Sequence, residues 1–271
     1  MEKRWVVRMR VVVMEKKTLV STAVCLLLVV VAAVCTVLSL AGEEQEVFAA
    51  GSAPAIRRVA AEDKVVALTF DTAFGEDQTE KILEILKRRN VKATFAVMGL
   101  WAQQNPHLLG QIMEDGHEVI SHSMAHERYA DLSPSAAVED ARAAANYLKL
   151  EAGVETVFIR PPYGQVDEKT SAALTEAGFI PLAWSLDSRD WQQEDPGELS
   201  RQVLSAVRPG EIVLFQNNRP VTPLALEEIL HSLDEMDYTC CTVSQMVATE
   251  GYTVDAAGVQ KAAAGEGAHA K

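Results

Sequence analysis

The chain has 271 residues, of which 48% are hydrophobic and 23% charged, and its formal net charge is −13. The hydrophobic fraction excludes a mostly disordered protein, because disordered chains lack the apolar residues that build a core. The acidic balance argues against a nucleic-acid-binding protein, which needs Lys and Arg to neutralise phosphates. Four cysteines are too few for a disulfide-built scaffold of this length. The length suffices for one large domain or two small ones.

The first 42 residues predict a membrane segment. Residues 1–17 form a basic stub, and residues 18–42 contain no charged side chain. An uncharged run of this length spans a hydrocarbon core of about 30 Å, and the basic flank places the stub in the cytoplasm. We therefore expect an uncleaved transmembrane anchor at 18–42, with the rest of the chain outside the cytoplasm. The alternative is a signal cleaved in the small-residue run at 47–53, which would release a secreted domain.

Composition divides the remaining chain into three parts. Residues 43–62 are polar, Ala-rich and aperiodic, which indicates a linker. Residues 253–271 are of low complexity, which predicts a disordered tail. We expect one domain over 63–252.

Strands and helices alternate along this domain. Short apolar runs rich in β-forming residues predict strands at 64–70, 92–99, 117–121, 156–160, 180–185, 211–215 and 238–243. Helices are expected at 78–89, 101–115, 133–150, 167–177, 197–207 and 222–236. Such alternation predicts an α/β fold with a parallel sheet, either open or closed into a barrel. In both architectures functional residues gather where strands end.

Polar side chains follow several of these strands. Asp71 ends the first strand, and the third leads into His122 and His126. Alone, Asp71 is most simply a cap of the next helix. Two His four residues apart can share one metal ion, although this spacing is weak evidence by itself. The fourth, fifth and sixth strands run into RPPYG (160–164), WSLDSRDW (184–191) and FQNN (215–218), and this recurrence at successive strand ends predicts a functional site.

These motifs resemble those of a known family. The stretches TFD, HSMAH, RPPYG, LDSRDW and GEIVLF, in that order between about residues 64 and 248, are similar to polysaccharide deacetylases of the NodB-homology type, carbohydrate esterase family 4. The resemblance implies a distorted (β/α) barrel, here preceded by one transmembrane helix. It also implies a hydrolase that removes N-acetyl groups from N-acetylglucosamine-type cell-wall polysaccharide with a divalent metal, expected to be zinc. The polymer stays open between peptidoglycan and a chitin-like chain.

The resemblance assigns a role to each matching residue at the reacting centre. Asp71 matches the general base that takes a proton from the attacking water. Arg160 would hold Asp71 ionised and oriented through a charge-assisted hydrogen bond. His122 and His126 match metal ligands, and the metal would act as a Lewis acid on the water and the acetyl oxygen.

Further matches concern the transition state and the substrate. The backbone N–H of Tyr163 matches the family's oxyanion donor. Trp184 and Trp191 are expected to line the sugar groove together with Tyr163. Asp190 matches a residue that orients the catalytic acid in relatives.

Two positions depart from the family pattern. Thr72 stands where the family usually has a second Asp that ligates the metal, so metal occupancy is expected to be impaired. Glu76 or Asp77 is an alternative ligand, although a helix-opening role is favoured for both. Gln216 stands at the position of the His that acts as general acid, and a carboxamide does not titrate near neutral pH.

Two functional hypotheses follow. One is a metal-dependent deacetylase impaired by Thr72 and Gln216. The other is a catalytically inactive deacetylase-like barrel that binds cell-wall glycan. A barrel unrelated to sugars is a third interpretation. Cys240 and Cys241 lie on the last predicted strand, where packed thiols are the default, and we assign them no role.

Overall fold

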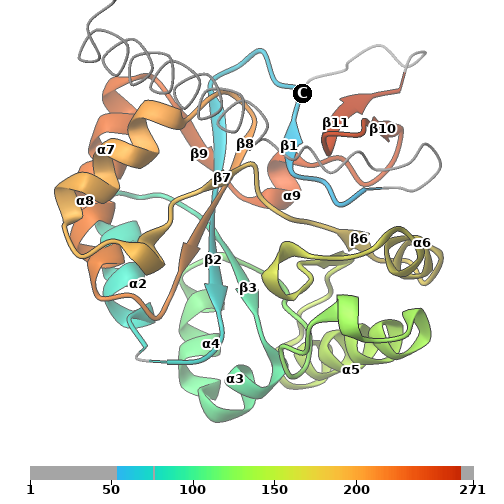
Figure 1. The fold of residues 1–271 in the computed structure, drawn as a ribbon. Helices are drawn as coiled ribbons and strands as arrows, with labels where there is room; N and C mark the ends of the chain where they lie inside the picture. The colour runs from blue at the N-terminus through green and yellow to red at the C-terminus, as the bar shows by residue number, and fades with distance from the viewer. Residues whose placement is uncertain (1–53, 76, 264–271) are drawn as a thin grey trace, which may run out of the picture. The chain divides into compact units, whose positions relative to one another are not determined.

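The computed structural model describes residues 54–75 and 77–263 (Figure 1). The strands are β1 (Arg58–Val59), β2 (Val65–Thr72), β3 (Thr94–Val97), β4 (Glu118–Ser121), β5 (Phe158–Ile159), β6 (Ile180–Pro181), β7 (Leu186–Asp187), β8 (Glu211–Gln216), β9 (Thr239–Cys241), β10 (Tyr252–Val254) and β11 (Val259–Ala262). The α-helices are α2 (Thr79–Arg88), α3 (Gly99–Gln104), α4 (Pro106–Glu114), α5 (Pro134–Ala152), α6 (Glu168–Glu176), α7 (Pro196–Ala206), α8 (Val221–Glu235) and α9 (Val243–Met246). Single 3-10 turns lie at Tyr129–Asp131, Pro162–Gly164 and Asp190–Gln192.

The described strands form one curled sheet in the order β10-β11-β1-β8-β2-β3-β4-β5-β6, with β7 beside β8 and β9 beside β2. Strands β8, β2, β3, β4, β5 and β6 are parallel. A single bridge between Ile56 and Leu182 links the segment before β1 to the segment after β6. The α/β class predicted from the sequence is confirmed, and the carboxyl ends of the parallel strands meet at one end of the curl (Figure 1).

Strand β2 shows how the two faces of the sheet differ. Side chains alternate between faces along a strand. Val66, Leu68 and Phe70 belong to the large core under the helices, whereas Ala67 belongs to a smaller cluster inside the curl. Phe70 stacks between Phe95 and Phe215, with ring centroids 5.2 and 5.5 Å away. Even positions of β2 therefore face the helices, and odd positions face the inside of the curl.

Helices cover the outer face of the sheet. Helix α2 buries Ile82, Leu83, Ile85 and Leu86 in the large core, and Glu80 in its first turn and Lys87 and Arg88 in its last complement its dipole. Helices α2, α7 and α8 lie on one side of the sheet in Figure 1, and α5 and α6 lie on another.

Helix α5 has clear start and stop signals. Its Ser133 cap accepts a hydrogen bond from the Ala136 N–H, Pro134 occupies the first turn, and Gly153 ends it in the left-handed conformation.

Two expected elements are divided in the structure. The helix expected at 101–115 is two helices, α3 and α4, because Pro106 has no N–H to continue α3 and instead opens α4. The strand expected at 180–185 ends at Pro181, and β7 follows as a separate short strand beside β8.

The domain extends beyond the predicted limits of 63 and 252. Strand β1 lies in the predicted linker and pairs with β8, and β11 lies in the predicted tail and pairs with β1 and β10. The buried Gln260 side chain explains the order of this end, because its amide accepts from Ala248 N–H and donates to the Ala248 carbonyl, both at 2.8 Å. The prediction of a disordered tail was therefore wrong for residues 253–263.

Within residues 54–75 and 77–263, no helix has the length and apolarity needed to cross a membrane. The anchor expected at 18–42 lies outside the described residues.

Candidate active site

Four of the predicted site residues lie on the inner face of the curled sheet: Asp71, His122, Arg160 and Gln216. Each stands two or four residues after a member of the inner cluster, namely Ala67, Ile120, Phe158 and Ile212. Asp71 and Gln216 are register partners on neighbouring strands. Strand alternation and parallel pairing therefore bring residues that are far apart in the sequence to one end of the sheet.

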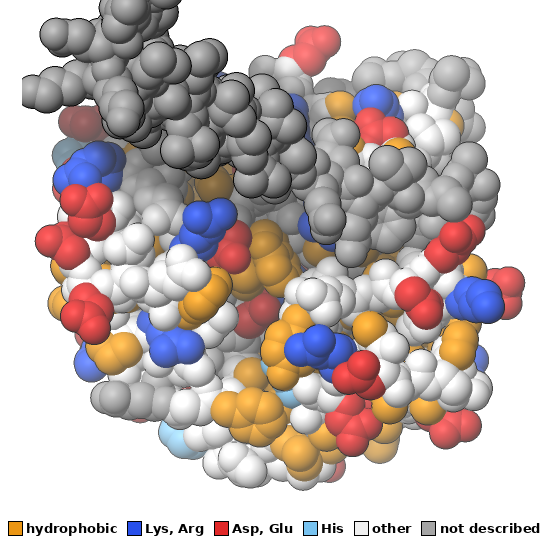
Figure 2. Space-filling view, viewed as in Figure 1, with side chains coloured by type: hydrophobic (Ala, Val, Ile, Leu, Met, Phe, Trp, Pro, Cys, Tyr) orange, Lys and Arg blue, Asp and Glu red, His pale blue; other side chains and the backbone are white. Residues whose placement is uncertain are grey.

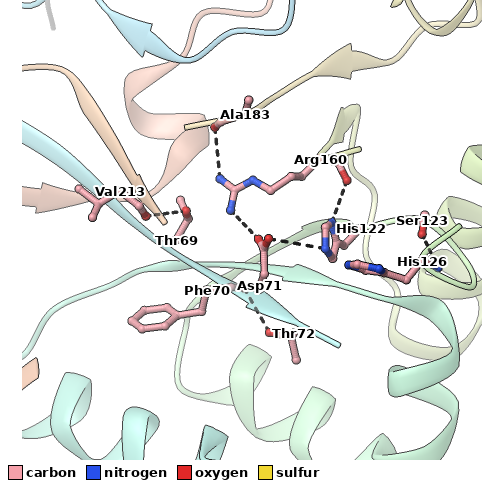
Figure 3. Close-up of polar contacts among 10 residues, drawn as sticks. All are labelled: Thr69, Phe70, Asp71, Thr72, His122, Ser123, His126, Arg160, Ala183 and Val213. Atoms are coloured by element: carbon pink, nitrogen blue, oxygen red, sulfur yellow. Dashed lines mark hydrogen bonds and ion pairs between the residues drawn. The ribbon is translucent and has the colours of Figure 1, made fainter. Parts of the chain in front are cut away.

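The Arg160 guanidinium contacts the Asp71 carboxylate (Figure 3). Arg160 donates from Nη1 to Asp71 Oδ1 at 2.7 Å, and the Arg160 side chain is 0% exposed against 14% for Asp71. The second carboxylate oxygen, Oδ2, lies 3.6 Å from Nε2 of His122. A buried charge pair of this geometry fixes the carboxylate in one orientation.

His122 presents a free ring nitrogen to the site. Its Nδ1 lies 2.8 Å from the carbonyl oxygen of Arg160. Because a carbonyl only accepts, Nδ1 carries a proton, so in the neutral ring Nε2 presents its lone pair. This Nε2 is buried and has no hydrogen-bond partner among the described residues.

His126 lies beside His122, with the ring centroids 4.8 Å apart. Its backbone N–H donates to Ser123 Oγ at 2.8 Å, which fixes the turn between the two His. Burial lowers the pKa of His126 to about 4, and the neighbouring His122 adds to this effect. His126 is therefore neutral at pH 7, and neutral imidazole is the form that binds a metal ion.

Thr72 does not join the two His. As an even position of β2 it points to the helix-covered face, where it is fully buried and donates to the Phe70 carbonyl at 3.2 Å (Figure 3). Asp77 opens α2 instead, since its carboxylate accepts from the Thr79 N–H and the Trp101 indole, both at 2.7 Å. The other alternative ligand, Glu76, lies outside the described residues.

The residues present thus fit a divalent cation in part. The unpartnered Nε2 of His122 and the neutral ring of His126 are suitable nitrogen ligands. No group of three or more His, Cys, Asp or Glu able to hold a metal occurs in the described part of the chain. Catalytic zinc sites usually have three protein ligands, so two imidazoles form an incomplete set.

Asp190 contacts the backbone of Gln216. Asp190 Oδ2 accepts from the Gln216 N–H at 2.8 Å and from Thr222 Oγ1 at 2.6 Å. Its other oxygen is buried without a partner in the described ranges, and burial raises the pKa of Asp190 to about 6. Asp190 therefore ties the end of β8 to the start of α8, and its role in orienting an acid stays a prediction.

These residues open into a cleft of about 550 Å³. Asp71 and Gln216 line it together with the aromatic side chains of Phe74, Tyr163, Trp184 and Trp191. Tyr163 is 51% exposed and Trp191 47% exposed, so both can contact a ligand. Exposed aromatic faces around a carboxylate are suited to sugar rings, which stack their C–H faces on aromatics. The structure thus places every predicted substrate-binding side chain in one cleft.

Sequence reasoning missed several residues of this cleft, among them Phe74 and Arg219. Phe74 is 57% exposed and lies edge-on to His126 at 5.8 Å, but an apolar loop residue carries no functional signal. Arg219 follows the polar run at the end of β8, and that position was its one available signal.

Comparison with known proteins identifies the family. The polysaccharide deacetylase family model matches residues 58–181. The chain is 32% identical over 184 residues to the peptidoglycan-N-acetylglucosamine deacetylase PgdA of Listeria monocytogenes, covering 68% of this chain and 39% of that protein. It is 30% identical over 190 residues to a peptidoglycan-N-acetylglucosamine deacetylase of Bacillus cereus, covering 68% of this chain and 89% of the relative. The chain belongs to the polysaccharide deacetylase family. It spans about two fifths of the length of the Listeria relative.

Solved structures of this family include both enzymes and an inactive member. A CE4 family pseudoenzyme from Bacillus anthracis is 26% identical with a TM-score of 0.69, covering 73% of this chain and 70% of that one. A mutant of this pseudoenzyme is described as having restored enzymatic activity. The Bc1960 peptidoglycan N-acetylglucosamine deacetylase is 29% identical with a TM-score of 0.68, covering 73% and 95%. The relatives named as deacetylases are hydrolases, and this agrees with the hydrolase class expected from the sequence.

Proposed function

We propose that this polysaccharide deacetylase family member removes N-acetyl groups from an N-acetylglucosamine-type cell-wall glycan bound in the cleft, and that it does so slowly. The observation that carries the proposal is that Asp71 lines an aromatic-lined cleft while the buried side chains of Arg160 and His122 contact its carboxylate. The names of the relatives support the glycan as substrate.

The proposed chemistry begins at Asp71. Arg160 occupies Oδ1, so Oδ2 remains to accept the proton of a water that attacks the acetyl carbonyl carbon. The backbone N–H of Tyr163 is the proposed donor to the resulting oxyanion. Tyr163 has a φ of 63° in the turn after β5, and this left-handed conformation sets the direction of its peptide groups. The same turn presents the Tyr163 ring to the cleft.

His122 and His126 are the proposed ligands of a divalent cation, expected to be zinc. When bound, such a cation supplies Lewis-acid polarisation of the acetyl oxygen and of water. The side chains themselves contribute neutral nitrogen donors, one of them already freed by the Nδ1 contact of His122. With Thr72 turned to the opposite face, we expect weaker binding of the cation than at a three-ligand site.

Slow turnover follows from Gln216. The departing amine needs a proton, and a carboxamide at this position cannot supply it. General acid–base catalysis typically contributes about 10²–10⁴-fold in rate. Because Gln216 cannot act as the acid, we expect the protein to lack the share of this rate enhancement that a general acid supplies.

The proposal is tested by measuring acetate release from N-acetylglucosamine oligomers with added Zn²⁺. The purified protein is expected to release acetate slowly, and Asp71→Asn to reduce the rate by about 10²-fold or more because the base is lost. Equal rates in the two proteins would rule out Asp71 as the base.

A second candidate function is glycan binding without turnover. It is favoured by the lack of a third ligand at the His pair among residues 54–75 and 77–263, by Gln216, and by the similarity to a pseudoenzyme. Here the wild-type protein would bind the oligomers but release no acetate, and Gln216→His would gain activity. Acetate release from the wild type that disappears in Asp71→Asn would exclude this candidate.

We propose in addition that residues 18–42 anchor the protein in a membrane, with the catalytic domain outside the cytoplasm. The support is the uncharged run behind a basic stub, together with the cell-wall polymer named for the relatives. Mass measurement of the natural protein tests for the alternative, cleavage near 47–53.

A further inference from the structure

Arg219 contributes an unneutralised positive charge to the cleft. It is the only Lys or Arg among the described residues that line this cavity. Its side chain has no ion pair or hydrogen bond with any described residue, and its Nε is buried without a partner. A buried donor left without an acceptor is unfavourable, so such groups in native proteins call for an explanation.

Two other arginines near the cleft, Arg160 and Arg128, have partners. Arg160 forms an ion pair with Asp71, with 2.7 Å between Nη1 and Oδ1. Arg128 lies over the Tyr163 ring at 4.9 Å from the centroid and faces Asp131 at 3.9 Å. Arg219 differs from both because no carboxylate of the described chain lies within ion-pair distance.

Two carboxylates near the cleft, Asp187 and Asp190, do not form an ion pair with Arg219. Asp187 also lines the cleft, but its Oδ1 accepts from the Arg189 N–H at 2.8 Å. Asp190 is buried behind the end of β8, where it receives two hydrogen bonds from other groups. Arg219 lowers the pKa of Asp190 only as a minor influence, behind burial and both hydrogen bonds. The guanidinium is thus available to a ligand.

The backbone that carries Arg219 is fixed. The Asn217 N–H donates to the Asp71 carbonyl at 3.0 Å, and the Asn217 amide donates to Thr79 Oγ1 at 3.1 Å. The Asn218 amide donates to the Phe74 carbonyl across the cleft edge. Gly75 permits this close approach, because a Cβ there would lie 2.7 Å from Asn218 Nδ2. Arg219 therefore projects from a preorganised edge, two positions from the site wall formed by Asn217 and Asp71.

An anion-binding residue is unexpected in so acidic a protein. The net charge of −13 disfavours anionic ligands in general, and on the face shown in Figure 2 basic side chains are scattered singly among acidic ones. The one Arg in the cleft that has no partner among the described residues is therefore suited to bind a single anionic group on a ligand that is otherwise uncharged. Guanidinium matches carboxylate in shape and hydrogen bonding.

We propose that Arg219 is a specificity-determining residue that binds a carboxylate on the glycan, on a sugar next to the N-acetylated unit. The inference rests on the proposed glycan substrate and narrows its class to acidic N-acetylated polymers over neutral, chitin-like ones. The carboxylate is supplied either by an ether-linked acid on an amino sugar or by a uronic acid.

Binding of three tetrasaccharides to the full-length protein tests the proposal. The first is neutral N-acetylchitotetraose, the second alternates N-acetylglucosamine with N-acetylmuramic acid, and the third alternates N-acetylglucosamine with glucuronic acid. At low salt we expect one or both acidic probes to bind about tenfold more tightly than the neutral probe, since a charge-assisted hydrogen bond is worth about one such factor. The acidic probe that binds more tightly than the neutral probe identifies the source of the carboxylate. High salt should reduce this difference in affinity.

Variants then assign the preference to Arg219. Arg219→Gln should abolish the preference for the acidic probes over the neutral probe, and Arg219→Lys should retain part of it because the charge remains. Arg142→Gln is the matched control. Arg142 is exposed on α5, so this substitution removes one positive charge at a position outside the cleft. Equal binding of all three probes by the wild type, or a preference that survives Arg219→Gln, would overturn the inference and leave the proposed function intact. Absence of binding to every probe would overturn both.

Discussion

At Asp71 and Arg160, two opposite charges lie almost entirely out of water. The Arg160 side chain has two further contacts: a 3.4 Å hydrogen bond from Nη2 to the Ala183 carbonyl, and the ring of Trp184, whose centroid is 5.8 Å from the guanidinium carbon. Neither can neutralise the guanidinium if the carboxylate is removed. The ion pair therefore fixes the orientation of Asp71, the proposed base, and also contributes to the stability of the folded state.

We predict that Asp71→Asn lowers the free energy of unfolding by about 3 kcal/mol, because it leaves a buried charge without its counterion. The double variant Asp71→Asn with Arg160→Met should recover a large part of this loss, since both charges are then gone. Urea unfolding followed by circular dichroism measures both values. An unchanged midpoint in Asp71→Asn would contradict the role of the pair.

Asp190 predicts a pH dependence of stability. Its pKa is raised by burial from 3.8 to about 6 in the folded state, so its stabilising contribution is complete below about pH 3.8 and is lost as the pH rises through about 6. Between pH 4 and pH 7 we expect the wild type to lose about 2 kcal/mol of unfolding free energy relative to Asp190→Asn. Parallel pH profiles of the two proteins would contradict the prediction.

Part of the site could be predicted at the level of residues. Asp71, His122, Arg160 and Gln216 were found from the sequence because polar residues after apolar strands converge in a parallel sheet. The orientation of Thr72 was also encoded, since it shares the alternation of Leu68 and Phe70. Phe74 and Arg219 were not predictable, because their places depend on loop conformations held by contacts with distant residues, such as the one between Asn218 and Phe74.

Among the elements, the strands of the parallel sheet and most helices followed from apolar periodicity. The exceptions are the shortest strands. Strand β1 has only Arg58 and Val59, and its order comes from pairing with β8 and β11, more than 150 residues away in the sequence. A two-residue strand carries no periodic signal of its own, so the domain limits were placed too far inward.

A substitution at Gly210 tests the packing of β1 at the edge of β8. Its φ is +79°, and a Cβ there would lie 1.9 Å from the carbonyl oxygen of Val59 in β1. We predict that Gly210→Ala lowers the free energy of unfolding by about 2 kcal/mol and loosens the β1–β8 pairing. Hydrogen exchange of the β1 amides together with thermal unfolding measures both effects.

Gly110 provides the matched control for Gly210. It lies within α4 with no atom within 4 Å of an added Cβ, so Gly110→Ala should stabilise the protein by about 0.5–1 kcal/mol. If both substitutions had the same effect, close packing of β1 on Gly210 would not explain the loss.

For the whole molecule, the cleft contains Asp71 and His126, while Thr72 and Gln216 depart from the pattern expected for the family. The register of β2 with β8 sets Gln216 directly beside Asp71 on the inner face, and Asp190 still holds the backbone at that point. Under the proposed function, the backbone at position 216 is positioned for a general acid, and the side chain present there does not titrate near neutral pH.

The most direct test is the rate of acetate release from N-acetylglucosamine oligomers by Gln216→His compared with the wild type, with Zn²⁺ present and Gln216→Asn as the non-titrating control. The account predicts that Gln216→His raises the rate by about 10²-fold or more and that Gln216→Asn does not. A Gln216→His protein that folds and binds the oligomers but is no faster than the wild type would contradict it.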